Sequence, residues 1–174
     1  MRPLHYGRLP SMRYRDQPTI EVTQRVRSDV MSAWRAVTDI RLPARCSTEL
    51  QDVEWLGGAD RVTVGARFRG YNENPAMGSW QTECEIVEVD EGKRWVWNVV
   101  GGQGPIATWA FEVEPTSDGV LIRQWARMGL STSGLTAAII ARPELEGRIV
   151  ARRLADWQQN MQTNLDCIRD QLEA

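Results

Sequence analysis

The C-terminal segment constrains the fold of this chain more than any other part of it. Its apolar side chains recur every three or four residues, at Val150, Leu154, Trp157, Met161, Leu165, Ile168 and Leu172. On a helix these positions share a stripe about 80° wide, along a rod roughly 45 Å long. A stripe of that length needs an apolar partner surface, which the rest of the chain must supply.

Segments with a period of two residues can form that surface. Residues 19–26 alternate between apolar and polar, residues 30–37 follow a helical period, and a second helical turn or two is expected before Leu50. Further strands are predicted from Val53 and over 62–73, 79–90, 93–101, 107–115 and 119–129, joined by short turns rich in Gly and Pro. Short turns favour antiparallel neighbours. We predict an α+β fold: a curved, seven-stranded antiparallel sheet wrapped around the long C-terminal helix, with two short helices after the first strand.

This order of elements resembles the helix-grip fold of the START and birch pollen allergen superfamily. The motifs that sharpen the resemblance are V-E-W-L-G-G, V-G-A-R-F-R-G-Y-N, S-W-Q-T-E-C-E-I-V-E-V-D-E-G-K-R-W-V-W, A-T-W-A-F-E-V-E-P-T-S-D-G and M-Q-T-N-L-D-C-I-R-D-Q-L-E. Together they look like the SRPBCC branch named polyketide cyclase/dehydrase. The resemblance implies a cavity between sheet and helix that holds a hydrophobic small molecule. In the aromatase/cyclases of that family the cavity positions a flexible polyketide, whereas many relatives have no established reaction.

The chain is expected to form one domain over residues 18–174. Residues 1–17 contain four Arg and two Pro without a continuous apolar run, so they are predicted to form a flexible arm and not a secretory signal. No apolar run reaches the ~20 residues of a membrane span. The formal net charge of -2 lacks the basic footprint that nucleic acids require, so the predicted partner is a small molecule.

Cysteine and histidine usage limits the chemistry. Cys46, Cys84 and Cys167 lie far apart without a C-x-x-C pair, so neither a disulfide framework nor a zinc site is expected, and a cytoplasmic protein is favoured. The single histidine, His5, belongs to the arm. Catalytic couples and metal sites built on histidine are therefore not expected, and we predict no metal or other cofactor.

Gly70 and Asn72 occupy inward positions of the strand predicted over 62–73, where a packed core would hold bulk. A turn at 74–78 pairs the inward residues Phe68 with Cys84, Gly70 with Thr82, and Asn72 with Trp80. In one interpretation Gly70 leaves space for a ligand. In the other it supplies a bulge or a left-handed backbone angle that curves the sheet.

The same register places charged residues on the outer face. Arg69 is predicted opposite Glu83, and Arg67 opposite Glu85. Cross-strand ion pairs of this kind explain the acidic cluster around Glu83 without catalysis.

The predicted cavity residues come from inward strand positions and from the helix stripe. They are Phe68, Gly70, Asn72, Trp80, Thr82, Trp95, Trp97, Trp109, Gln124, Met128, Trp157 and Met161. The tryptophans can wall a cavity or fill a core, and the amides can line a wet cavity or bond to backbone at its rim. Residues 130–142 can be a lid over the cavity or a short amphipathic helix that covers the sheet edge.

Three functions stay open. The first is binding of a hydrophobic, partly oxygenated molecule of lipid or polyketide type, and the second is a polyketide cyclase/dehydratase. Binding is favoured because Tyr71 points outward and neither a histidine nor a carboxylate is placed inside. The third is a partner-binding or dimerising module that uses Leu121 and Trp125 on the outer face. The chain can accordingly be a monomer or a homodimer.

Overall fold

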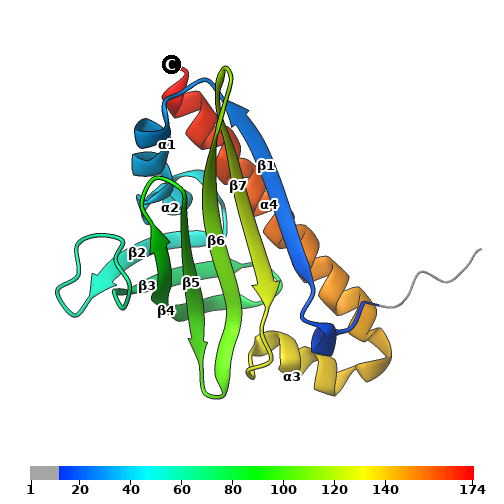
Figure 1. Ribbon diagram of the computed structural model, residues 1–174. Coiled ribbons are helices and arrows are strands. Elements are labelled where there is room, and N and C mark those ends of the chain that lie inside the picture. The colour runs from blue at the N-terminus through cyan, green and yellow to red at the C-terminus, as the bar shows by residue number, and fades with distance from the viewer. Residues whose placement is uncertain (1–11) are drawn as a thin grey trace, which may run out of the picture.

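The computed structural model describes residues 12–174, and within them one antiparallel sheet curves around a long helix (Figure 1). The sheet has seven strands in the order β1-β7-β6-β5-β4-β3-β2. Their bounds are β1 (Thr19–Val26), β2 (Leu50–Leu56), β3 (Arg67–Asn74), β4 (Gly78–Asp90), β5 (Arg94–Gly101), β6 (Gly104–Thr116) and β7 (Gly119–Met128). The predicted α+β architecture is confirmed.

Six helical segments complete the described part of the chain. They are η1 (Tyr14–Asp16), α1 (Val30–Val37), α2 (Leu42–Cys46), α3 (Gly134–Ala141), η2 (Pro143–Leu145) and α4 (Glu146–Leu172). The two short helices after the first strand, α1 and α2, are those predicted. Asp29 caps α1, because its Oδ1 accepts a hydrogen bond of 2.9 Å from the backbone N of Ser32.

Strand β3 begins five residues later than the sequence pattern predicts. Gly65 adopts a positive φ of 85° in a turn over the preceding residues. Its backbone N donates to the carbonyl of Ile86, so the chain reaches the sheet only there. The apolar alternation around Val64 therefore belongs to a loop.

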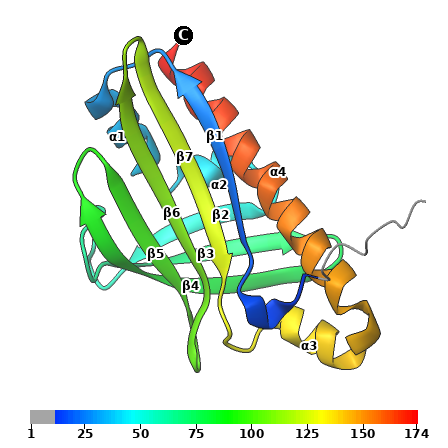
Figure 2. The same cartoon turned by 45° about the vertical axis from the view of Figure 1, so that its right-hand side comes forward.

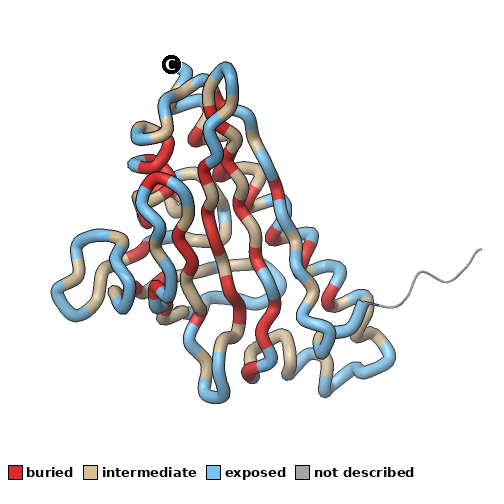
Figure 3. Tube along the Cα trace, viewed as in Figure 1, coloured by how far each residue is buried: buried red, intermediate tan, exposed pale blue. Residues whose placement is uncertain are grey.

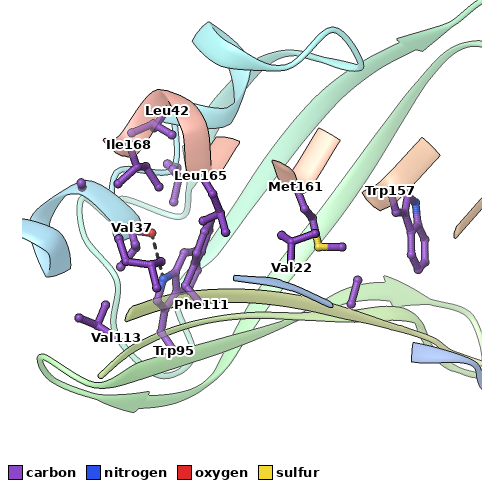
Figure 4. Packing of buried hydrophobic residues seen from close by; sticks show 14 of the residues in the cluster. Val22, Val37, Leu42, Trp95, Phe111, Val113, Trp157, Met161, Leu165 and Ile168 are labelled. Carbon is purple, nitrogen blue, oxygen red and sulfur yellow. Dashed lines mark hydrogen bonds between the residues drawn. The ribbon is translucent and has the colours of Figure 1, made fainter. Parts of the chain in front are cut away.

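The predicted stripe of α4 is the centre of the core. Val150, Leu154, Trp157, Met161, Leu165 and Ile168 are buried, and Asn164 is buried among them. The helix runs beside β1 and also contacts β7, α1 and α2 (Figure 2). Figure 4 shows Leu165 over Trp95 and Phe111, and it shows the indole N–H of Trp95 donating to the Val37 carbonyl at 3.0 Å. That bond joins β5 to α1.

The register between β3 and β4 agrees with the prediction. Phe68 faces Cys84, Gly70 faces Thr82, and Asn72 faces Trp80. Along β7, buried residues alternate with mostly half-buried ones (Figure 3).

The outer face carries the predicted charges with one difference in pairing. Arg69 lies opposite Glu83 and binds it at 2.8 Å, but Arg67 reaches diagonally to Glu83 at 2.8 Å instead of binding Glu85. The hydrogen bond from Arg69 holds the pKa of the Glu83 carboxyl below its ordinary value. These ion pairs are exposed and lie outside the cavity.

The prediction that the cysteines form no disulfide is wrong. Cys46 of α2 and Cys167 of α4 are joined, with their Cα atoms 6.1 Å apart. The two cysteines are 121 residues apart in sequence, so no local motif predicts their pairing. Because two of the three cysteines are paired, unpaired thiols no longer favour a cytoplasmic protein. None of the helices within residues 12–174 combines the length and apolar character that a membrane crossing needs.

Part of the predicted flexible arm, residues 14–16, forms η1 and contacts the rest of the domain. Tyr14 donates its hydroxyl to the Ser131 carbonyl at 3.0 Å, and its backbone N donates to Glu146 Oε1 at 2.9 Å. These bonds hold η1 against the segments on both sides of α3. Residues 1–11, with His5, lie outside the described part of the chain.

Candidate functional site

A cavity of about 480 Å³ lies between the inner face of the sheet and α4. Strands β3, β4, β5 and β6 supply aromatic side chains to its lining. Its floor comes from Val37 of α1, Pro43 of α2 and Ile40 between these helices. Helix α4 forms the opposite wall. The volume falls within the range of cavities that hold small organic molecules.

Eleven of the twelve predicted cavity residues line this space. They are Phe68, Gly70, Asn72, Trp80, Thr82, Trp95, Trp97, Trp109, Gln124, Met128 and Trp157. Met161 is the exception. It is fully buried, and Figure 4 shows its side chain beside Val22 in the core. Its position in the helix stripe predicted that it would be buried. Some residues of that stripe pack in the core, however, and others line the cavity.

Four tryptophans, Trp95, Trp97, Trp109 and Trp157, form a continuous wall that is also part of the core or packs against it. The rings of Trp97 and Trp109 are stacked at 6.3 Å with only 13° between their planes, and Trp157 lies 4.9 Å from Trp109. Trp95 stacks on Trp97 at 4.2 Å. Because the indole N–H of Trp95 is used by Val37, this ring offers the cavity its face alone.

Gly70 contributes to the lining as a glycine with an ordinary backbone. It is absent from the positive-φ residues, which excludes the left-handed interpretation. A Cβ at this position would lie 3.0 Å from Thr82 Oγ1 and 3.1 Å from Leu50 Cδ1. The space beside Gly70 is therefore narrow, and its neighbours are side chains.

The mouth of the cavity lies between the β3–β4 turn and the start of α3. Met77 of that turn is 42% exposed, and a Cβ on Gly134 would lie 3.7 Å from its Cε. Leu135 of α3 and Tyr14 of η1 line the cavity beside them. Residues 130–142 thus contain a short helix, as one interpretation predicted. This helix lies at the cavity mouth, where the other interpretation predicted a lid.

An ion pair near the mouth is a feature that sequence reasoning missed. Both terminal nitrogens of Arg153 donate to the Glu49 carboxylate at 2.7 Å, and the two side chains are 12% and 13% exposed. The guanidinium carbon lies 5.6 Å from the Trp80 ring centre and 5.5 Å from that of Trp157. Arg153 is therefore held in its plane by a carboxylate and on its faces by indoles.

Two pairs of neutral polar side chains also belong to the cavity wall. One pair joins β3 to β4, and the other joins α4 to β7. Asn72 donates to Thr82 Oγ1 at 3.3 Å. Asn164 of α4 donates to Gln124 Oε1 of β7 at 3.4 Å, and both residues are buried and line the cavity. Each predicted amide is thus in the cavity wall and bonds to another side chain, not to backbone at a rim.

The ionisable groups of the lining are poorly suited to act as free acids or bases. Asp39 is paired with Arg45 at 2.6 Å, and Glu49 is paired with Arg153. Burial raises the pKa of the Cys84 thiol to about 12, so it carries no thiolate at neutral pH. Burial likewise raises the pKa of Tyr14. Within residues 12–174 no three side chains of His, Cys, Asp or Glu gather as a metal site would require.

Two missed residues of the lining, Arg153 and Asn160, follow a helical spacing that the sequence contains. Arg153, Trp157, Asn160 and Asn164 recur at i, i+4, i+7 and i+11 and all line the cavity. This polar row flanks the apolar stripe and could have been found from Trp157. No sequence signal links Glu49 to Arg153, because they are 104 residues apart.

Comparison with solved structures supports the same arrangement. The chain is similar to the di-domain ARO/CYC StfQ from the steffimycin biosynthetic pathway (TM-score 0.68, 18% identity), covering 92% of this chain and 52% of that one, so it spans about half of the di-domain protein. It is similar to a Polyketide_cyc-like protein from Corynebacterium glutamicum (TM-score 0.61, 22% identity, coverage 89% and 91%). It is also similar to Ara h 8.0201 (TM-score 0.59, 12% identity, coverage 90% and 97%).

These likenesses show the fold, which is the helix-grip fold, at identities too low to show more. No curated protein is similar enough in sequence to count as a relative. The family model described as "Polyketide cyclase / dehydrase and lipid transport" matches residues 17–171, almost the whole chain. With the curved sheet, the long helix and the cavity between them, that match identifies the chain as a member of the polyketide cyclase/dehydrase and lipid transport family.

Proposed function

We propose that this protein binds a hydrophobic, partly oxygenated small molecule, of lipid or polyketide type, in the cavity between its sheet and α4. The observation that carries the proposal is the cavity of about 480 Å³ whose walls are mainly apolar and include eight aromatic side chains. A flat apolar ligand can stack on the surfaces of Trp97, Trp109 and Trp157. The eleven lining residues predicted from sequence are the proposed contacts.

The polar groups support an oxygenated ligand that is held rather than transformed. The carboxylates of Asp39 and Glu49 are each committed to an arginine, and Cys84 is kept as a thiol by its high pKa. A general acid or base must be free to donate a proton to the reacting group or to accept one from it. Binding accordingly accounts for these groups better than catalysis.

Polyketide cyclisation and dehydration is the second candidate, favoured by one observation. Glu49 and Arg153 lie together at the cavity wall, so movement of the pair would bring a carboxylate and a guanidinium to a bound ligand. The family description and the likeness to di-domain ARO/CYC structures are compatible with this chemistry. A cyclase would change the product ratio of a poly-β-ketone substrate relative to buffer, and Glu49→Gln would abolish the change. A binder would leave that ratio as it is.

The binding proposal is tested with the neutral fluorescent probe N-phenyl-1-naphthylamine. Two variants fill the cavity from opposite walls, Gly70→Phe from β3 and Asn160→Trp from α4, while Thr23→Phe adds an aromatic ring to an exposed position of β1. We expect saturable binding by the unmodified protein and by Thr23→Phe, and loss of binding in both cavity variants, with circular dichroism confirming that each is folded. Equal binding by all four proteins would place the probe outside the cavity and refute the proposal.

A further inference from the structure

The amide pair at the deep end of the cavity has unused hydrogen-bonding capacity. Asn164 and Gln124 are 4% and 2% exposed, and their one mutual bond uses Asn164 Nδ2 and Gln124 Oε1. Asn164 Oδ1 is buried and accepts no hydrogen bond from the described residues. A buried polar atom without a partner is costly, so a group that donates a hydrogen bond to Asn164 Oδ1 would be favoured at this position.

The remaining capacity has a defined chemistry. Gln124 Nε2 is left as a donor beside Asn164 Oδ1 as an acceptor, because the bond between the two amides uses the other atom of each. Rotating both amides by 180° would exchange the roles and leave Asn164 Nδ2 as the donor and Gln124 Oε1 as the acceptor. Either assignment therefore leaves one donor and one acceptor unused where Asn164 and Gln124 form part of the cavity wall.

A charged ligand group does not fit this end of the cavity. The cationic side chain of the lining is Arg153, which is bonded through both terminal nitrogens to Glu49. It stands eleven residues before Asn164 on α4, roughly 16 Å along the helix axis. A carboxylate or phosphate at the amide pair would be buried without a counter-charge.

We infer that the Gln124–Asn164 pair binds a neutral hydroxyl group, an alcohol or phenol, on the ligand. A hydroxyl donates one hydrogen bond and accepts others, which matches an adjacent acceptor and donor. Phe111 and Trp95 flank this end of the cavity with apolar surface, so the carbon atom that bears the hydroxyl is aromatic or aliphatic. The inference rests on the proposed binding function and narrows its ligand to hydroxylated hydrophobic molecules.

The test compares three neutral probes of one shape by isothermal titration calorimetry. 2-Naphthol donates and accepts, 2-methoxynaphthalene only accepts, and 2-methylnaphthalene does neither. We expect the unmodified protein to bind 2-naphthol roughly tenfold more tightly than either other probe, since one net hydrogen bond corresponds to about that ratio. Equal affinities for all three would overturn the inference and leave the binding function standing. No binding of any probe would overturn both.

A double variant, Gln124→Leu with Asn164→Leu, assigns the preference to this pair. Replacing both amides together leaves no unpaired polar atom, so the variant is expected to fold and to bind 2-methylnaphthalene at least as well as before. Its preference for 2-naphthol should fall to within about twofold. The control Gln158→Leu changes an exposed amide of the same helix and should keep the full preference. Survival of the preference in the double variant would contradict the inference.

Discussion

Gly70 shows how one missing side chain shapes a cavity wall. It is a buried strand residue with an ordinary φ, and the nearest atoms to a Cβ at this position belong to Thr82 and Leu50. The sheet irregularity nearby is in β2, between Leu50 and Asp52, and not at Gly70 itself. The glycine therefore makes room for neighbouring side chains. The effect of replacing it depends on the space around a new side chain and not on backbone strain.

Gly70→Ala is expected to change the free energy of unfolding by less than about 1 kcal/mol, because Leu50 can shift and the loss of unfolded-state entropy offsets the crowding. The affinity for a cavity probe should fall modestly. Gly58→Ala is the matched control: it has open space but a φ of 79°, so it should be the more destabilised variant. Urea denaturation of both variants provides the comparison, and a larger loss at Gly70 would show that its neighbours cannot move.

The Arg153–Glu49 pair is expected to matter for stability because it is nearly buried. Arg153→Met leaves a carboxylate without its partner and should destabilise the fold by roughly 3 kcal/mol, whereas the double variant with Glu49→Leu should recover most of that loss. Arg152→Met breaks a pair on the exposed side of the same helix, where Arg152 is 78% exposed, and should cost less than about 0.5 kcal/mol. A double-mutant cycle without coupling between positions 49 and 153 would contradict this account.

At the scale of elements, α2 and α4 are tied in two ways. They contact each other, and the Cys46–Cys167 disulfide crosses between them. Pro43 and Ser47, on either side of Cys46, line the cavity. The disulfide therefore fastens a cavity wall to the helix that the sheet surrounds.

Loss of the disulfide should lower the free energy of unfolding by roughly 2–4 kcal/mol, since it closes a long loop in the unfolded chain. The comparison is Cys46→Ser/Cys167→Ser against Cys84→Ala, which keeps the bridge. A thiol assay supports the assignment: folded protein at pH 8 should not react, because burial raises the pKa of Cys84 to about 12 and leaves almost no thiolate at that pH. Denatured protein should show one thiol without reductant and three with it.

The short element η1 joins the N-terminal segment to the cavity mouth. A chain starting at Pro18 lacks Tyr14 and its bonds to Ser131 and Glu146, whereas a chain starting at Met12 retains them. We expect the shorter chain to melt at a lower temperature and to bind the cavity probe more weakly. Tyr14→Phe removes only the hydroxyl bond and should cost about 1 kcal/mol. Identical melting and binding of the two chains would show that η1 contributes nothing to the mouth.

At the scale of the whole molecule, the continuity of the sheet unites the fold. Each strand is hydrogen-bonded to its neighbour across the whole sheet, from the β1 edge to the β2 edge. Helix α4 contacts both the sheet and the small helices. The core cluster draws on all of these elements. Within residues 18–174 the helices and the sheet therefore share one core.

Thermal unfolding is therefore expected to be a single transition. Far-ultraviolet circular dichroism and tryptophan fluorescence should give the same midpoint, because the indoles of the cavity wall and the hydrogen-bonded sheet are lost together. A saturating ligand, at about 100 times its Kd, should add about 2.7 kcal/mol to the free energy of unfolding and raise both midpoints equally. Separate midpoints for the two signals would indicate two cooperative units.

Periodicity in the sequence determined the elements and the direction of their side chains. The 3.6-residue stripe of α4 and the two-residue alternation of the strands depend only on local geometry, so the fold and eleven of the cavity residues could be predicted. The turn at 74–78 likewise sets the β3–β4 register, because a short hairpin allows one pairing.

Tertiary structure alone decided the contacts between segments distant in sequence. Cys46 meets Cys167, Glu49 meets Arg153, and Tyr14 meets Ser131, across 104 to 121 residues of sequence. Such pairs depend on how far α4 lies along the sheet and how it is rotated, which no local pattern encodes. The same placement puts Met161 into the core and Asn164 into the cavity, although both lie on the inward side of one helix. Periodicity specifies which face is inward, and only packing specifies what that face meets.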